Sequence, residues 1–241
     1  MLFGWFYFDW TILILIPGIL FTLWAQMKVK SSYNRYSQAF LPGYMTGAAM
    51  ARRILDSNGL SHVPIEIVRG HLSDHYDPRH KVLRLSEAVY HGNNVAAVGV
   101  AAHEVGHALQ DAKGYVPLRF RIAIVPACNI GSHLAMPLFI IGLFMAGLSV
   151  MADWLMLAGI VAFSLSVFFQ LITLPVEFNA SRRAMRCLTG SGVMSDEQLK
   201  GSRKVLSAAA MTYVAALAAG LLSLLRLLLI AASASSRRNS R

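Results

Sequence analysis

The stretch Val98-Gly-Val-Ala-Ala-His103-Glu104-Val-Gly-His107-Ala-Leu-Gln-Asp111 carries the pattern His-Glu-x-x-His within an apolar run. Two histidines four residues apart project from one face of an α-helix, one turn apart. Both imidazoles can then bind one tetrahedral metal ion, most often zinc. Glu104 lies beside such a metal, where a carboxylate can take a proton from an attacking water. The pattern therefore predicts metal-assisted hydrolysis of a peptide bond.

The residues around the motif place it on a helix. Asn93 or Asn94 offers a side chain that can cap the helix N-terminus, and Gly114 follows where a C-terminal glycine is expected. The predicted helix has about five to six turns. The alternative is an ordinary buried helix with two hydrogen-bonded histidines and no metal.

The composition indicates a membrane protein. Hydrophobic residues make up 56% of the chain and occur in blocks, while only 14% of residues are charged. The net charge of +10 reflects an excess of Lys and Arg, which in a membrane protein usually lies in cytoplasmic loops. The sequence has no polar tract in which basic and aromatic residues alternate, so we do not expect a nucleic-acid partner. Two cysteines, Cys128 and Cys187, are too few for a disulfide framework or a zinc ribbon.

The apolar blocks predict a mainly α integral membrane protein with about four transmembrane helices and a small α+β domain. Its segments are an N-terminal anchor at 1–27, a region with the motif helix at 28–121, a transmembrane hairpin at 122–176, a polar segment at 177–204, and a transmembrane helix with a basic tail at 205–241. Flanking Lys and Arg residues predict that both polar segments are cytoplasmic. Four spans then place the tail outside, although Arg237, Arg238 and Arg241 favour the opposite side.

Within the first polar segment, Thr46 to Asn58 has the pattern of an amphipathic helix. Pro64 to Val68 and Lys81 to Leu85 are expected strands, and Ser73 to Pro78 between them is an expected turn. The strand at 81–85 could present an edge to an extended substrate.

Some histidines lie outside the motif. We expect His71, His75 and His80 to be solvated loop residues and not a second metal site. His133 falls inside an apolar span, where we expect it to be packed and hydrogen-bonded.

A catalytic zinc usually has three protein ligands and one position for water. The histidine-free run after His107 excludes a third histidine at short spacing. The best candidate is Glu177, because the intervening hairpin returns the chain to the level of the motif helix. The alternative is a carboxylate paired with Arg182 or Arg183 at a helix end.

Ligating imidazoles need hydrogen-bonding partners that orient them. Asp111, four residues beyond His107 on the same face, is a plausible partner, and Asn179 and Ser181 are weaker candidates. The oxyanion of the reaction also needs a stabilising group besides the metal. The candidates are Tyr76, His75, Arg182 and Arg183.

The chain resembles the YugP-type family of membrane neutral zinc metallopeptidases along nearly its whole length. The matching residues are Ser73-Asp-His-Tyr-Asp-Pro78, Leu83-Arg-Leu-Ser86, Ala102 to Gln110, Leu174-Pro-Val-Glu177-Phe178, Ala180 to Arg183 and Ala209 to Val214. The layout is also similar to HtpX-type and CAAX-prenyl proteases, where two spans separate His-Glu-x-x-His from a ligand glutamate.

The resemblance implies that His103, His107 and Glu177 are zinc ligands and Glu104 is the general base. It also implies a zincin-like, specifically gluzincin-like, catalytic domain on the cytoplasmic side. Related proteins commonly carry an aspartate near the ligand glutamate, where this chain has Asn179 and Ser181.

The sequence thus predicts a membrane-embedded zinc metalloendopeptidase with one Zn²⁺ per chain, acting on polypeptides, including membrane proteins, at the cytoplasmic face of the bilayer. One alternative is a non-proteolytic membrane scaffold with a structural or lost metal site, against which the intact Glu104 argues. The other is an intramembrane site-2 protease, which would need a Leu-Asp-Gly motif that the later spans lack.

Overall fold

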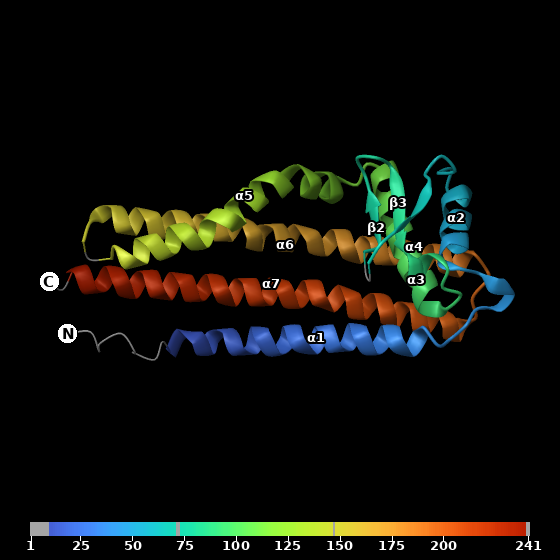
Figure 1. The fold of residues 1–241 in the computed structure, drawn as a ribbon, viewed down its shortest axis with the longest axis horizontal. Coiled ribbons are helices and arrows are strands. Elements are labelled where there is room, and N and C mark those ends of the chain that lie inside the picture. Colours follow the sequence, from blue (N-terminus) through green and yellow to red (C-terminus); the bar gives the residue numbers. More distant parts are fainter. Residues whose placement is uncertain (1–9, 71–72, 147, 240–241) are drawn as a thin grey trace. The chain divides into compact units, whose positions relative to one another are not determined.

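The computed structural model describes residues 10–70, 73–146 and 148–239, with side chains described up to residue 236. Helices form most of the chain (Figure 1). The elements are η1 (Trp10–Ile14), α1 (Leu15–Tyr36), η2 (Pro42–Tyr44), α2 (Gly47–Ser57), β1 (Ile65–Val68), β2 (His75–Asp77), β3 (Val82–Ser86), α3 (Glu87–Tyr90), α4 (Val95–Ala112), α5 (Val116–Phe144), α6 (Val150–Gly190) and α7 (Asp196–Asn239).

The chain forms two compact units. The helical unit comprises Met1–Trp24, Arg121–Ile172 and Tyr213–Arg241, and the mixed unit comprises Ala25–Phe120 and Thr173–Thr212. Among the residues that the structure describes, four helical segments are long and apolar enough to cross a membrane, which confirms the expected number of such helices. They are Trp10–Tyr36, Val116–Phe144, Val150–Gly190 and Asp196–Ser236.

In the helical unit, α5 packs closely on α6. A Cβ atom on Gly142 would lie 2.7 Å from the carbonyl oxygen of Ala152, and one on Gly159 would lie 2.7 Å from that of Ala135. Backbones approach this closely only where side chains are missing, as is common between membrane helices. The two helices of the expected hairpin are interrupted between Phe144 and Val150.

His133 lies on the exposed side of α5, away from this contact. Within the single chain, His133 is therefore not packed against another helix, contrary to expectation. The residues that pack against α6, such as Gly131 and Ala135, occupy the opposite face of the helix.

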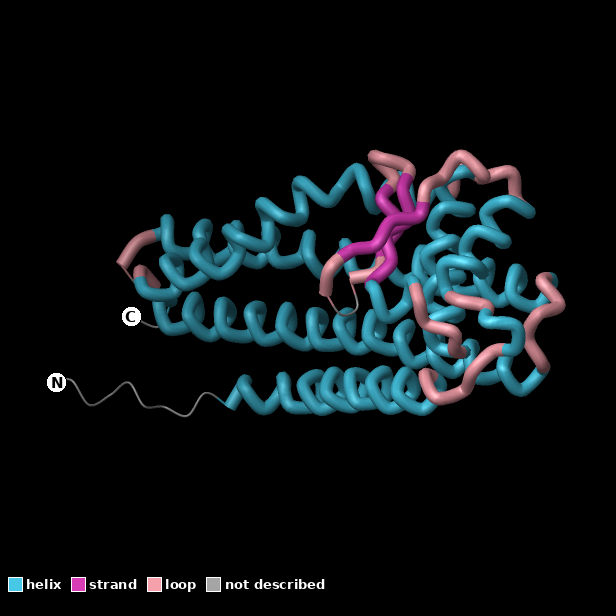
Figure 2. Tube along the Cα trace, turned by 45° about the vertical axis from the view of Figure 1, so that its right-hand side comes forward, coloured by secondary structure: helices cyan, strands magenta, loops and turns pink. Residues whose placement is uncertain are grey.

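The mixed unit contains a three-stranded sheet in the order β1-β3-β2, drawn in magenta in Figure 2. β1 pairs with β3 in parallel, and β2 pairs with β3 antiparallel. The expected turn at Ser73–Pro78 is thus wrong in part, because it contains a short strand whose Tyr76 is buried between exposed or half-buried neighbours. The suggested free edge at Lys81–Leu85 is also wrong, because β3 is the central strand and both of its edges are paired.

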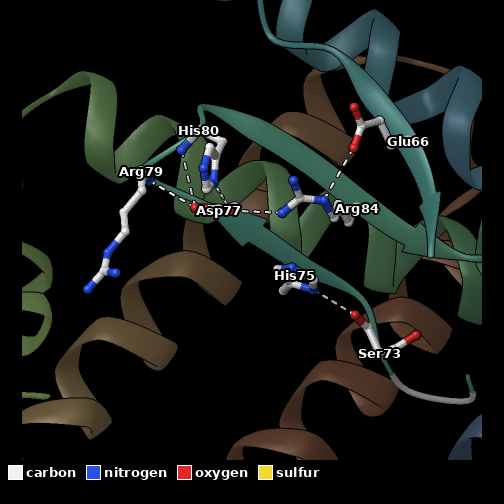
Figure 3. Close-up of polar contacts among 7 residues, drawn as sticks. All are labelled: Glu66, Ser73, His75, Asp77, Arg79, His80 and Arg84. Carbon is white, nitrogen blue, oxygen red and sulfur yellow. Dashed lines mark hydrogen bonds and ion pairs between the residues drawn. The ribbon is translucent and has the colours of Figure 1, made fainter. Parts of the chain in front are cut away.

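A charged network covers the polar face of this sheet (Figure 3). Arg84 on β3 donates to Asp77 on β2 over 2.8 Å and to Glu66 on β1 over 3.2 Å. Asp77 also accepts from the ring of His80 and from the backbone N–H groups of Arg79 and His80. The hydrogen bonds from His80 and Arg84 hold the pKa of Asp77 well below its usual range.

The other face of the sheet packs on the core of the mixed unit, through which α4 passes. Asn94 caps α4, its side chain accepting from the N–H of Ala97 over 2.9 Å, and Gly114 follows with a φ of +62°. Both ends of the motif helix therefore lie where the sequence predicts them. The largest fully buried side chains of this core include Met50, Leu55, Val63, Leu83, Leu85, Val98, Val105 and Leu188.

Candidate metal centre

The structure brings together His103, His107 and Glu177, from α4 and α6 within the mixed unit. One ligand atom from each lies within 4.8 Å of the others. Nε2 of His103 is 3.2 Å, and Nε2 of His107 3.6 Å, from Oε2 of Glu177. Only 15%, 11% and 3% of these three side chains is exposed, so the cluster is largely shielded from water.

A glycine makes this meeting of helices possible. A Cβ atom on Gly106, between the two histidines, would lie 2.5 Å from the carbonyl oxygen of Ala180 on α6. Any side chain at this position would push the two backbones apart. The glycine within His-Glu-Val-Gly-His therefore sets the distance at which Glu177 faces the histidines.

The donor set fits zinc. Two imidazole nitrogens and one carboxylate oxygen are common ligands of catalytic zinc, which keeps a fourth position for water. With metal–ligand bonds of about 2.0–2.1 Å, neighbouring ligand atoms of a tetrahedron lie roughly 3.3 Å apart. The nitrogen–oxygen distances of 3.2 and 3.6 Å lie close to this value.

Gln110 fixes the orientation of His107. Its Nε2 donates to two acceptors, the carbonyl of Val176 over 2.8 Å and Oδ1 of Asn179 over 3.1 Å. Oε1 of Gln110 therefore faces Nδ1 of His107, 3.0 Å away, and must accept from it. The proton on Nδ1 leaves the lone pair on Nε2, the nitrogen that points to Glu177.

The expected orienting residues divide into two groups. Ser181 lies beside His103, with its Oγ 3.1 Å from Nδ1 of that ring, and Asn179 holds Gln110 and accepts from Arg183 over 2.7 Å. Asp111 instead accepts from the hydroxyl of Tyr76 over 2.9 Å and from Lys81 over 3.1 Å. The sequence reasoning missed Gln110, which could have been found as a residue three positions beyond His107 on the same helix face.

Glu104 lies between the two histidines in sequence and next to β2 in space. Its pKa is raised to about 7, mainly by burial and also by the charges of Glu177 and Asp74, against the opposing effects of His103 and the backbone N–H of Tyr76. A carboxylate with a raised pKa accepts a proton more readily, which suits a general base.

The four oxyanion candidates lie in different settings. The Tyr76 hydroxyl donates to Asp111, and burial together with that hydrogen bond raises its pKa. His75 is exposed, with Nδ1 2.7 Å from the carbonyl of Ser73 (Figure 3). Arg182 is exposed, and Arg183 lies over the ring of Tyr115 at 5.9 Å. The choice among them stays a prediction.

The remaining histidines of the polar region do not join a metal-binding group among the described residues. His80 is 72% exposed and lies beside Asp77. His71 lies outside the described residues.

The comparisons with known proteins agree with this arrangement. Residues 11–232 match the profile of a family described as "Putative neutral zinc metallopeptidase". The chain is 48% identical, over 91% of its own length and 95% of the other, to a Bacillus subtilis protein named "Putative membrane protease YugP". No solved structure matches the chain.

Proposed function

The chain belongs to the neutral zinc metallopeptidase family that it matches, and from this premise we propose that it is a membrane-embedded zinc metalloendopeptidase. The observation that carries the proposal is the approach of His103, His107 and Glu177 to within 4.8 Å beside Glu104. These three residues would hold one Zn²⁺ per chain. When bound, the ion would polarise the scissile carbonyl and make a water molecule acidic enough to attack it.

In this proposal Glu104 moves the proton. Its carboxylate takes a proton from the attacking water and delivers it to the nitrogen of the leaving amine. The burial of Glu104, which raises its pKa, supports this role because a desolvated carboxylate accepts a proton more readily. Gln110 and Ser181 orient the ligating rings, and limited exposure of the cluster keeps bulk water away from it.

The position of β2 supports a peptide substrate. β2 lies at one edge of the sheet, and the N–H of Tyr76 faces the Glu104 carboxylate. An extended polypeptide could add to this edge and bring its carbonyl to Glu104. A bound-peptide structure in which the substrate backbone does not pair with β2 would contradict this part of the proposal.

The proposal also includes a zincin-like catalytic domain and a cytoplasmic location for the metal centre. A motif helix in contact with a small sheet supports the zincin-like architecture. The basic residues that flank both polar segments support a cytoplasmic site. Within the helical unit, Ser235 near the end of α7 donates to Asp153 near the start of α6, and Arg226 donates to Thr11, each over 3.1 Å. The first contact supports a common side for the α5–α6 turn and the end of α7, as four spans require.

The first test compares the wild type with Glu104→Gln. Both proteins are purified in detergent without chelators, their zinc is quantified, and both are assayed on an unfolded casein-like substrate. We expect one zinc in each, cleavage by the wild type, and at least about a hundredfold loss in the variant, because general acid–base catalysis contributes 10²–10⁴-fold.

Absence of zinc from the wild type would overturn the proposal. Zinc in both proteins with equal cleavage would remove Glu104 from its role. Zinc in both without any cleavage would favour the non-proteolytic scaffold, and a screen of membrane-protein substrates would then separate the scaffold from a selective protease.

A further inference from the structure

The two faces of α5 differ in chemistry. One face packs on α6 through small or buried residues, namely Cys128, Gly131, Ala135, Phe139 and Gly142. The opposite face carries Asn129 and His133, four residues apart and both exposed. Within the part of the chain that the structure describes, neither side chain has a hydrogen-bond partner.

These two side chains lie near the middle of an apolar helix. Asn129 is about 12 Å along the helix from Arg121, and His133 is about 16 Å from Phe144, at a rise of about 1.5 Å per residue. If α5 crosses the bilayer, as the proposed function requires, both groups lie well inside a hydrocarbon layer about 30 Å thick. An amide and an imidazole facing lipid would lose hydrogen bonds to water without replacing them.

A third polar group lies at the same depth. Pro137 is inside α5 and has no N–H, so the carbonyl oxygen of His133 lacks its usual helical donor. Ser132, in contrast, donates to the carbonyl of Asn129 over 2.9 Å and is already satisfied. Together with this freed carbonyl, the exposed side chains of Asn129 and His133 form one narrow polar stripe on α5.

We propose that this stripe is a homodimer contact, at which α5 of one copy pairs with α5 of a second copy. Asn129 and His133 each carry both a donor and an acceptor when the imidazole is neutral, so two identical stripes can satisfy each other across a two-fold axis. A second copy brings matching groups to the same depth by symmetry, whereas an unrelated helix would need to carry them by coincidence. Polar side chains of this kind stabilise helix pairs in membranes.

The proposal can be tested by cross-linking in native membranes. Cys128→Ala and Cys187→Ala give a cysteine-free background, and Ile140→Cys then places a thiol on the same face, seven residues beyond His133. Val161→Cys on α6 is the matched control, since Val161 is 56% and Ile140 41% exposed. On oxidation we expect a disulfide-linked dimer from Ile140→Cys and not from Val161→Cys.

A second pair of variants tests the stripe itself. In the Ile140→Cys protein, Asn129→Leu with His133→Leu keeps the helix apolar and removes the hydrogen bonds, so the cross-linked fraction should fall about tenfold. Zinc content should not change, because neither residue belongs to the proposed metal centre.

Several results would overturn the dimer contact. They are cross-linking no greater than that of Val161→Cys, cross-linking to a different protein, or a dimer that survives both leucine substitutions. Extraction of the same membranes at alkaline pH distinguishes failure of the dimer contact from failure of the proposed membrane-spanning function. A chain that stays in the membrane with zinc but without dimer contradicts only the contact, while a chain released from the membrane removes its premise as well.

Discussion

Two helices, α4 and α5, each pack closely on α6 at a glycine, and the two contacts have different roles. In the mixed unit α4 meets α6 at Gly106, and in the helical unit α5 meets α6 at Gly142 and Gly159. Polar side chains that bond to one another surround the first contact, whereas mainly apolar residues surround the second. A close glycine contact can therefore serve two purposes. Beside the proposed ligands it sets the distance between Glu177 and the histidines, and beside apolar residues it allows two helices to pack.

The largest expected effect is that of Gly106→Ala. The added methyl group meets backbone atoms of Ala180 at 2.5–3.2 Å, so α4 and α6 must separate and Glu177 moves away from the histidines. We expect loss of bound zinc and a fall in kcat/KM of about a hundredfold, a cost that a 1 Å misplacement of a reacting group can carry.

Gly99→Ala is the matched control on the same helix. Its methyl group would first meet the side chain of Ser202, at 3.2 Å, which can adjust more easily than a backbone. Zinc titration of both variants should show near-normal binding only for Gly99→Ala. Equal zinc affinity in the two variants would contradict the role assigned to the Gly106 contact.

Gln110→Ala should have the next largest effect. The substitution removes the acceptor that fixes the proton on Nδ1 of His107, and loss of such a partner typically costs 10–100-fold in metal affinity. Competition with a zinc chelator would measure it. Gln198→Ala is the control, because Gln198 forms a capping box with Ser195 at the start of α7, away from the histidines. A similar loss of zinc affinity in Gln198→Ala would show that weakening any helix of the mixed unit lowers zinc affinity.

In the helical unit, Gly159→Ala should reduce stability and spare the metal. Its methyl group would lie 2.7 Å from backbone atoms of Ala135 and Phe139. Overpacking of this kind costs about 1–3 kcal/mol, which thermal unfolding in detergent would detect, while the zinc content of the folded fraction should stay normal. Zinc loss from folded Gly159→Ala would show that the two contacts are not independent.

The smallest effect should come from Asp77→Asn, which weakens the charged network on the sheet but leaves both helix contacts intact. We expect a loss of about 1 kcal/mol in the free energy of unfolding at neutral pH. Because the folded pKa of Asp77 is lowered, this stabilisation is present above the usual carboxyl pKa of about 4 and is lost as the pH falls below it. Unfolding of both proteins at pH 7 and pH 3 would check the sign, since the difference should shrink in acid.

Sequence patterns predicted the long elements well. The number of apolar helices and the two ends of α4 follow from hydropathy and from local side chain–backbone bonding, which depend on near neighbours in sequence. Glu177 was predicted to meet the histidines by an argument about membrane crossings, and the structure brings it to them.

Features that depend on distant residues were predicted less well. β2 is three residues long and mostly polar, so its pairing with β3 produces no alternating hydrophobic pattern that the sequence could reveal. The exposure of His133 depends on which face of α5 packs on α6, and the sequence of α5 alone does not determine that face. Asp111 was expected to orient His107, but the buried hydroxyl of Tyr76 binds it instead.

The proposed metal centre has a consequence for the order in which the protein is made. His103 and Glu177 are 74 residues apart, with all of α5 between them. When a ribosome has produced α4 and α5, the growing chain therefore contains two of the three proposed ligands and the proposed base, but not the carboxylate of Glu177. If the proposed function holds, such a nascent chain would bind zinc weakly, and proteolytic activity would begin only after α6 has been synthesised.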